Sequence, residues 1–351
     1  MFPLDFPYGI LSTYAMAGEW VLDPFCGRGT TNYASRLLGL PSVGIDSNPV
    51  AVAIAQAKLA NTSPQRIMGA ARRILDEVQS PHEVPEGEFW DLAFDKTVLH
   101  ILCRLREGLV RDCRSASRQA LRAIIMGALH GPQPKSKASY FSNQCPRTYA
   151  PKPRYAIGYW KRKNLTPQPV DVLQIIKERA ERYYACETTT ADGIILVGDS
   201  RKRSMFSGIP SRLSFGWVIT SPPYYGMNTY IPDQWLRLWF LGGGATVNYS
   251  TGGQVEHSSP DRFVAELKQV WQNAGTVCKS HARLVIRFGA LNDRRRDPLG
   301  LAKQSLAQTG WRIMTVKQAG SASNGRRQAT HFARSDTTPL EEYDIWAEWI
   351  D

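Results

Sequence analysis

Three features of the chain predict an α/β fold built on a doubly wound, mainly parallel sheet. Short apolar runs of the kind that form buried parallel strands occur at residues 20–22, 41–45, 194–197 and 217–219. Segments with helical spacing of apolar residues, such as 97–112 and 262–277, lie between or after these runs. A glycine-bearing turn directly follows the first run, where a strand of such a sheet passes into a helix. With 351 residues, the chain is long enough for one enlarged domain or two.

The turn after the first strand has the composition of a ligand-binding turn. Its polar and small residues are Asp23, Gly27, Gly29, Thr30 and Thr31. The two glycines allow φ values and close backbone approach that a Cβ would forbid. The two threonines stand where a helix begins, and the N–H groups of a helix start favour a carboxylate or a phosphate. The spacing differs from the dinucleotide fingerprint because the third glycine is missing.

A second acidic residue, Asp46, ends the strand that follows. A carboxylate at this point suits the hydroxyl groups of a ribose, as in other doubly wound nucleotide-binding sheets. Asn48 and Pro49 then open a helix that we expect to reach about Ala60. Asp23 and Asp46 could instead be simple strand-end caps, but the two segments together, at this spacing, favour the binding interpretation.

A rigid aromatic segment, Ser221-Pro222-Pro223-Tyr224, follows the apolar run at 217–219. Two consecutive prolines fix φ twice and donate no N–H group, so the neighbouring carbonyl groups keep fixed directions. These carbonyls and Ser221 can accept hydrogen bonds from an exocyclic amine, and Tyr224 offers a flat face for stacking. Such a run by itself is common in surface turns, so its functional interpretation depends on the strand before it and on the glycine turn.

The chemistry that this segment suits is methyl transfer to an amino nitrogen. An amine on a heteroaromatic ring is a poor nucleophile because its lone pair is drawn into the ring. Fixed acceptors for both of its hydrogens favour a pyramidal nitrogen and direct the lone pair at a methylsulfonium carbon. No strong general base is needed before attack, since the nitrogen becomes acidic as it gains the methyl group.

Together these segments resemble the amino-group DNA methyltransferases, the family that makes N4-methylcytosine or N6-methyladenine with S-adenosylmethionine. Residues Asp23 to Thr31 resemble its first motif, Gly44-Ile45-Asp46 its acidic second motif, and Ser221 to Tyr224 its catalytic motif. There are two weaker similarities. Phe6-Pro7-Tyr8 resembles the segment that packs over the methionine end of the cofactor, and Gly198-Asp199-Ser200 resembles the motif whose acid bonds the adenine amino group.

The resemblance implies a Rossmann-like methyltransferase sheet, S-adenosylmethionine as the cofactor and two sets of site residues. Asp23 and the turn from Gly27 to Thr30 would hold the methionine part, Asp46 the ribose and Asp199 the adenine. The implied cofactor-binding residues are Phe6, Tyr8, Asp23, Phe25, Gly27, Gly29, Thr30, Thr31, Asp46 and Asp199. The implied catalytic residues are Ser221, Pro222, Pro223 and Tyr224. A base inside a duplex cannot reach a buried cofactor, so the target base would have to be flipped out.

The residue at the start of the catalytic motif bears on the target base. Serine at Ser221 resembles the cytosine-N4 members of the family, whereas aspartate is usual there in the adenine-N6 members. We therefore expect cytosine N4 as the target, with adenine N6 as the near alternative. An RNA guanine-N2 methyltransferase comes next, because similar Pro-Pro-Tyr loops occur there. A cofactor-free DNA-binding module is disfavoured by the intact glycine turn and proline segment.

The composition agrees with a nucleic acid partner. A formal net charge of +12 suits a polyanion, so we expect DNA, contacted through its phosphate backbone and a flipped base. The six cysteines include no Cys-x-x-Cys pair, which predicts reduced thiols and no metal site. No segment is long and apolar enough to span a bilayer, so we expect a cytoplasmic protein without a membrane partner. A partner nuclease, as in restriction-modification systems, is compatible with the sequence but indicated by no residue.

An insertion at residues 62–188 interrupts the predicted catalytic domain, which would comprise residues 1–61 and 189–351. The insertion has helical spacing at 97–112, 117–129 and 170–186. Between these helices, residues 131–163 contain eight Lys or Arg residues, six aromatic residues and no Asp or Glu. The prolines of this basic tract predict an extended loop and argue against a helix.

Basic groups neutralise phosphates and aromatic faces stack on unpaired bases, so the basic tract is the candidate DNA-contacting region. Its candidate residues are Lys135, Lys137, Arg147, Lys152, Arg154, Tyr155, Lys161, Arg162 and Lys163. The alternative is a solvated basic loop whose aromatic residues fill a small satellite core. Downstream, Asp233–Phe240 is expected to form a helix that supports the catalytic segment. Further helices are predicted at 262–277 and 298–309, and strands at 282–288, at 311–317 and near the end of the chain.

Overall fold

The computed structural model describes residues 2–134, 137–145, 152–186, 189–225, 234–247, 259–289, 297–321 and 341–350. The chain folds as two units. Unit 1 comprises Met1–Ala55, Thr188–Thr229 and Gly252–Asp351, and unit 2 comprises Gln56–Glu187 and Tyr230–Thr251. The predicted insertion, residues 62–188, falls almost entirely within unit 2, which begins earlier and includes a second segment from further along the chain.

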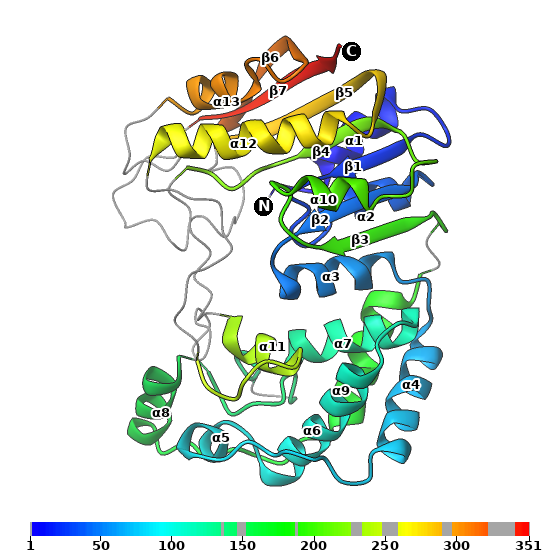
Figure 1. Cartoon of the computed structure of the whole chain (residues 1–351). Helices are drawn as coiled ribbons and strands as arrows, with labels where there is room; N and C mark the ends of the chain where they lie inside the picture. Colours follow the sequence, from blue (N-terminus) through cyan, green and yellow to red (C-terminus); the bar gives the residue numbers. More distant parts are fainter. Residues whose placement is uncertain are drawn as a thin grey trace. The chain divides into compact units, whose positions relative to one another are not determined.

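Unit 1 contains one sheet of seven strands in the order β3-β2-β1-β4-β5-β7-β6 (Figure 1). The strands are β1 (Trp20–Asp23), β2 (Ser42–Asp46), β3 (Gly193–Val197), β4 (Phe215–Thr220), β5 (Cys278–Phe288), β6 (Trp311–Ser321) and β7 (Glu341–Trp349). The first five strands pair in parallel, and β7 runs antiparallel to both of its neighbours. This doubly wound sheet confirms the predicted Rossmann-like methyltransferase fold class.

Both faces of the sheet are buried, which explains why its strands read as continuous apolar runs. Successive strand residues point to opposite faces. On β1, Val21 packs with the cluster that contains Phe6 and Leu11, whereas Leu22 packs with the cluster that contains Phe263 and Trp271. The same alternation holds on β4, where Trp217 and Val218 belong to different clusters. Most positions of β1 and β4 are therefore apolar, and the buried polar residues Asp23 and Thr220 stand at the strand ends.

Six helices of the part of unit 1 that the structure describes accompany the sheet. They are α1 (Asp5–Tyr14), α2 (Thr30–Leu37), α3 (Pro49–Leu59), α10 (Arg203–Ser207), α12 (Pro260–Gly275) and α13 (Pro298–Leu306), with α3 running on into unit 2. Figure 1 shows α12 lying along one face of the sheet, consistent with the burial of its residue Trp271. The predicted helices at 49–60, 262–277 and 298–309 are confirmed, while α1 was not predicted as a helix.

The strand order fixes where a ligand can bind. Strand β1 lies in the middle of the sheet, with β2 on one side and β4 on the other. The connection from β1 leads through α2 to β2, and the chain later returns to the opposite side of β1. The direction of winding therefore reverses between β1 and β4. In open α/β sheets the ligand crevice lies outside the carboxyl ends of the strands at such a switch point.

Within its described residues, unit 2 contains helices joined by loops and no strand. Its helices are α4 (Pro64–Glu77), α5 (Glu88–Ala93), α6 (Lys96–Arg111), α7 (Ala116–Ala128), α8 (Pro153–Arg162), α9 (Val172–Tyr184) and α11 (Trp235–Phe240). Helix α4 packs against α6, α7 and α9. Its buried residues Ile67, Ala71 and Ile74 recur at helical spacing and form the packing stripe. The predicted helices at 97–112, 117–129 and 170–186 are confirmed as α6, α7 and α9.

One expectation about unit 2 needs correction, and another is confirmed in part. The basic tract is not wholly extended, because its residues Pro153–Arg162 form α8. Proline is compatible with a helix at the first position, where no N–H group is needed, and Pro153 occupies that position. The predicted helix at 233–240 exists as α11, but its Trp235 and Trp239 pack on Trp90 of α5, with ring centroids 5.6 and 4.7 Å away. Its aromatic residues belong to the core of unit 2.

Within the described ranges, no helix combines the length and apolar character that a membrane crossing requires.

Candidate functional site

The glycine turn between β1 and α2 depends on backbone conformations that glycine favours. Gly27 has φ 50° and Gly29 has φ 68°, both in the left-handed region. A Cβ at Gly29 would lie 2.8 Å from the Cβ of Ala55, so a larger residue would clash. A Cβ at Gly27 would meet nothing within 4 Å. The turn is thus tightly packed at Gly29 and open at Gly27.

Asp46 holds this turn from the neighbouring strand. Its Oδ2 accepts a hydrogen bond from the N–H of Gly27 at 2.9 Å, and its Oδ1 accepts one from the N–H of Asn48 at 2.8 Å. Burial raises the pKa of Asp46, although these backbone hydrogen bonds oppose the effect. The acidic second motif therefore lies at the carboxyl end of β2, as predicted, in direct contact with the first motif.

The structure also brings the first motif and the catalytic segment together. Strands β1 and β4 are parallel neighbours, with Leu22 paired to Val218. Beyond this pair, Thr220 donates a hydrogen bond from Oγ1 to Oδ1 of Asp23 at 2.6 Å. Thr31 of α2 donates from Oγ1 to the carbonyl oxygen of Ile219 at 3.2 Å. Two segments far apart in sequence thus lie side by side at the carboxyl ends of two central parallel strands.

Asp23 carries a buried carboxylate oxygen that could receive a ligand group. Its Oδ1 accepts hydrogen bonds from Thr220 and from the N–H of Phe25, whereas Oδ2 is buried and has no hydrogen-bond partner among the residues described. Burial raises the pKa of Asp23 to about 6, against the lowering effect of its hydrogen bonds. A buried acceptor without a hydrogen-bond partner destabilises the fold, so a donor or cation supplied by a ligand would be bound favourably here.

The catalytic segment leaves β4, and Tyr224 and the residue after it, Tyr225, pack against aromatic residues of unit 1. Tyr224 donates a hydrogen bond from Oη to Oε1 of Glu342 at 2.7 Å, and its ring meets that of Phe288 edge-on at 5.6 Å. Tyr225 is buried and packs edge-on against Phe263 at 5.4 Å. Sequence reasoning missed Glu342, because an isolated acid far from every motif gives no local signal of its partner.

The remaining predicted cofactor residues have different surroundings. Phe6 is buried in α1, with the guanidinium of Arg287 3.8 Å from its ring centroid. Tyr8 is 40% exposed, so its ring is available at the surface of α1. Phe25 is partly buried and meets the ring of Trp271 edge-on at 6.0 Å.

Asp199, predicted to bond an adenine amino group, follows β3 and forms a two-point ion pair with Arg201. Arg201 Nε lies 2.9 Å from Oδ1, and Nη2 lies 2.7 Å from Oδ2. Arg201 also bonds Glu266 of α12 through Nη1 at 2.8 Å. Burial opposes ionisation of Asp199, but the hydrogen bonds from Arg201 outweigh it and lower the pKa. The carboxylate is therefore held in place and charged.

The basic tract presents its cations on α8 and beside it. Lys152, Arg154, Tyr155, Lys161, Arg162 and Lys163 are exposed, whereas Ala156 and Trp160 are buried. Lys161 forms an ion pair with Glu88, and Lys137 forms one with Glu178. Lys135 and Arg147 lie outside the described residues. The aromatic residues of the tract thus include core members, as the alternative interpretation expected, while those of its cations that the structure describes are exposed.

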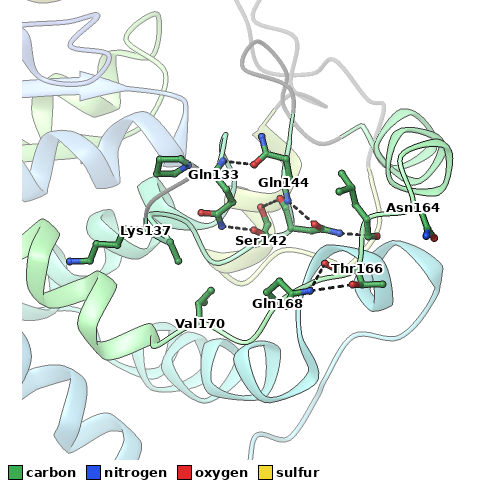
Figure 2. Close-up of a pocket in the computed structure, with 12 residues that line it drawn as sticks. Gln133, Lys137, Ser142, Gln144, Asn164, Thr166, Gln168 and Val170 are labelled. Atoms are coloured by element: carbon green, nitrogen blue, oxygen red, sulfur yellow. Dashed lines mark hydrogen bonds between the residues drawn. The ribbon is translucent and has the colours of Figure 1, made fainter.

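A pocket of about 540 Å³ within unit 2 is lined by residues of the basic tract and of the segment that follows it (Figure 2). Most of its lining amides bond the chain itself. Gln133 donates from Nε2 to the carbonyl oxygens of Tyr140 and Ser142 at 2.7 and 2.8 Å. Asn143 donates from Nδ2 to the carbonyl oxygens of Leu92 and Leu165 at 3.0 and 3.2 Å. Asn143 thus fastens the tract to α5 and to the segment after α8, whereas Gln133 holds the tract to itself.

Comparison with known proteins bears first on the N-terminal part of the chain. Residues 1–57, which include the glycine turn and Asp46, match the family model described as DNA methylase, N6_N4_Mtase. This segment is therefore similar to the amino-group DNA methyltransferases, the family that the motifs resemble. A curated relative, the type II methyltransferase M.MthZI of Methanothermobacter thermautotrophicus, is 30% identical over 78 residues. That match covers 22% of this chain and 22% of the relative, so the methyltransferase relationship spans about a fifth of either protein.

Solved structures resemble the chain over its whole length at low identity. A SAM-dependent methyltransferase from Methanosarcina mazei is 10% identical with a TM-score of 0.38, covering 100% of this chain and 98% of that one. The rRNA methyltransferase AviRa from Streptomyces viridochromogenes is 13% identical with a TM-score of 0.37, covering 99% of this chain and 85% of that one. With TM-scores this low, the methyltransferase fold assignment rests on the strand order and directions of the chain itself.

Proposed function

We propose that this protein transfers a methyl group from S-adenosylmethionine to the exocyclic amine of a flipped-out DNA base. Cytosine N4 is the proposed target and adenine N6 the alternative. The observation that carries the proposal is the hydrogen bond between Asp23 and Thr220, which joins the glycine turn to the strand that presents the catalytic segment. A methyl donor bound at the turn and an amine bound at the segment would be neighbours.

The residues around the turn fit S-adenosylmethionine, which when bound supplies an electrophilic methyl group on a cationic sulfonium. Asp23 has a buried Oδ2 without a hydrogen-bond partner in the described chain, which suits a cationic or donor group of the methionine part. The space at Gly27 leaves the turn open to a ligand. Asp46 stands at the end of β2, where a ribose diol is bound in doubly wound sheets. Asp199 is assigned to the adenine.

The chain's own contribution to the reaction is orientation. Pro222 and Pro223 fix the directions of the carbonyl groups around them, and Ser221 adds a further acceptor. Acceptors on both amine hydrogens hold the nitrogen with its lone pair directed toward the methyl donor. Tyr224 supplies the stacking face for the base. The exposed cations on α8 would neutralise DNA phosphates and hold the duplex while the base is flipped.

Mass spectrometry of methylated DNA tests this proposal. DNA and, in a parallel reaction, RNA are incubated with the protein and S-adenosylmethionine carrying an isotopically labelled methyl group, then digested to nucleosides. Labelled N4-methylcytosine is the expected product, and labelled N6-methyladenine would assign the alternative. A Tyr224→Ala variant serves as the control without a stacking face. Absence of label from DNA, or label in RNA guanine alone, would refute the proposal.

A further inference from the structure

We infer that Glu342 is a positioning residue of the proposed methyl-transfer site and that it acts by fixing the ring of Tyr224. This inference rests on the proposed function, in which Tyr224 stacks on the target base. Glu342 lies near the start of β7, the antiparallel strand of the sheet, and belongs to none of the motifs. Its assignment follows from its contact with Tyr224, its burial and the bonding of the next acid on the same strand.

The contact between the two side chains is a short hydrogen bond. The phenol of Tyr224 donates from Oη to Oε1 of Glu342 at 2.7 Å, a distance typical of a hydroxyl bonded to a carboxylate. The two residues are 118 positions apart in sequence. The bond therefore ties the end of a loop residue to a strand of the sheet.

A second contact fixes the rotation of the ring. The hydroxyl oxygen lies on the long axis of the phenol, so a hydrogen bond at this atom fixes the position of the ring and leaves it free to turn about that axis. The ring of Phe288 meets Tyr224 at an interplanar angle of 75° with centroids 5.6 Å apart. This edge contact selects one rotation. Glu342 and Phe288, from adjacent strands β7 and β5, together define the plane of the proposed stacking face.

Burial makes a purely space-filling role for Glu342 a poor explanation. Glu342 is 4% exposed. Burying a carboxylate costs the free energy of its hydration, a cost that an apolar side chain of similar size would not carry. The acid is better explained by the use of its acceptor oxygen. In turn, Glu342 accepts the hydrogen bond of the Tyr224 hydroxyl, so this donor needs no water molecule on the side of the ring that faces the sheet.

The next acid on the same strand has a similar task. Asp344 forms a two-point ion pair with Arg287, with distances of 2.8 and 2.7 Å. The guanidinium of Arg287 in turn covers the ring of Phe6, the predicted cofactor-packing residue, at 3.8 Å. Strand β7 therefore supplies two carboxylates that fix groups belonging to the two proposed halves of the site. Glu342 serves the base and Asp344 serves the cofactor side.

Steady-state and single-turnover methyl transfer to DNA, measured for a set of variants, tests the inference. Glu342→Ala should lower kcat by about tenfold or more, since small misplacements of a positioning group have large effects on rate. The KM for S-adenosylmethionine should stay within about twofold of the wild-type value, because the cofactor is bound elsewhere. Glu342→Gln should recover most of the activity, because its amide oxygen can accept the same hydrogen bond.

A double-mutant cycle separates action through Tyr224 from a general loss of structure. Tyr224→Phe keeps the ring and removes the donor, so the double variant Tyr224→Phe, Glu342→Ala should be no slower than the slower single variant. Glu348→Gln is the matched control. Glu348 lies on the same strand and bonds Arg312 and His281, and its replacement should leave kcat unchanged.

Three results would overturn the inference: an unchanged kcat in Glu342→Ala, multiplicative effects in the double variant, or a kcat loss accompanied by an equal loss of cofactor affinity and thermal stability. A wild-type protein that methylates no DNA would instead overturn the proposed function. Calorimetric binding of deoxycytidine and deoxyadenosine monophosphates, with S-adenosylhomocysteine present, then decides the role of Glu342. Weaker binding in Glu342→Ala with recovery in Glu342→Gln supports it, and equal binding in all three proteins rejects it.

Discussion

Thr220 and Asp23, 197 positions apart in sequence, are joined by a buried hydrogen bond of 2.6 Å. Each residue is the last of its strand, and the two strands are parallel neighbours. The bond therefore fixes the spacing between the glycine turn, which begins after Asp23, and the catalytic segment, which begins after Thr220. Methyl transfer requires the donor and the acceptor to be held at reacting distance and in the right orientation. In the proposed activity, this contact would help to hold the two binding segments in that arrangement.

Removal of this bond should weaken both the fold and the proposed cofactor site. Thr220→Val keeps the shape of the side chain and removes the donor, which should lower the free energy of unfolding by about 2 kcal/mol. The pKa of Asp23 should rise further, because the Thr220 hydrogen bond lowers it. Urea denaturation and calorimetry with S-adenosylmethionine measure the two effects.

Thr309→Val is the control for this variant. Thr309 is also buried, and its Oγ1 donates to the carbonyl oxygen of Leu306 after α13. We expect a comparable loss of stability and unchanged cofactor affinity. Equal cofactor affinities in Thr220→Val and the wild-type protein would show that the bond matters only for folding.

Binding of the cationic cofactor should depend on pH through Asp23. Burial raises the pKa of this carboxyl to about 6, so below that pH the group is mostly neutral and cannot attract a cation. Affinity for S-adenosylmethionine should therefore weaken as the pH falls from 7 to 5, by up to about tenfold for each unit below pH 6. Calorimetric titrations across this range should give a flat profile for Asp23→Asn.

The same shift has the opposite consequence for stability without ligand. Because the pKa in the fold exceeds the ordinary value of 3.8, folding favours the neutral acid. That contribution is fully present below pH 3.8 and is lost as the pH rises through about 6. The full loss corresponds to about 3 kcal/mol. Asp23→Asn should thus gain stability relative to the wild-type protein between pH 4 and pH 7, and a constant difference over this range would contradict the assignment.

The central part of the fold was predictable because its signals are local. The strands that end at Asp23, Asp46 and Thr220 are mainly apolar before their last residue because both of their faces are buried, and each ends where the chain turns. Helix α8 is not predicted because the prolines of the basic tract argue against a helix, although Pro153 stands at the first helical position, where proline is favourable. The buried pair Ala156 and Trp160, four residues apart, was the signal that could have identified it.

The site was predictable only in part, because some of its contacts join residues that are far apart in sequence. The glycine turn and the proline segment have compositions that report their conformations, whereas the bond between Tyr224 and Glu342 depends on how β7 pairs with β5. No spacing rule connects a residue of a loop with an acid 118 positions later. The same holds for Arg201, which engages Asp199 and Glu266 at once and whose neighbours come from separate elements.

Substitution of Gly29 by alanine should lower the free energy of unfolding more than the same substitution at another glycine with positive φ. In Gly29→Ala the new Cβ would lie 2.8 Å from that of Ala55 in addition to the cost of φ 68°, and the sum should be about 3 kcal/mol. Gly18→Ala has a comparable φ of 81° but meets nothing within 4 Å, so only the backbone cost should remain. Thermal or chemical unfolding of both variants measures the difference. Equal losses of stability would show that Ala55 can move away from the new Cβ without a cost in free energy.

The exposed cations of α8 should make a measurable contribution to DNA affinity if they contact phosphates. Arg154→Ala should weaken binding at low salt and reduce the slope of log affinity against log salt by about one, the value for a single lost phosphate contact. Lys161→Ala should have a smaller effect, because Lys161 already pairs with Glu88 and its charge is partly compensated. Arg312→Ala on β6, which removes an equal charge paired with Glu348, controls for the general effect of net charge. An Arg154→Ala slope that matches the Arg312→Ala slope would assign α8 to the scaffold of unit 2 and leave phosphate binding to other cations.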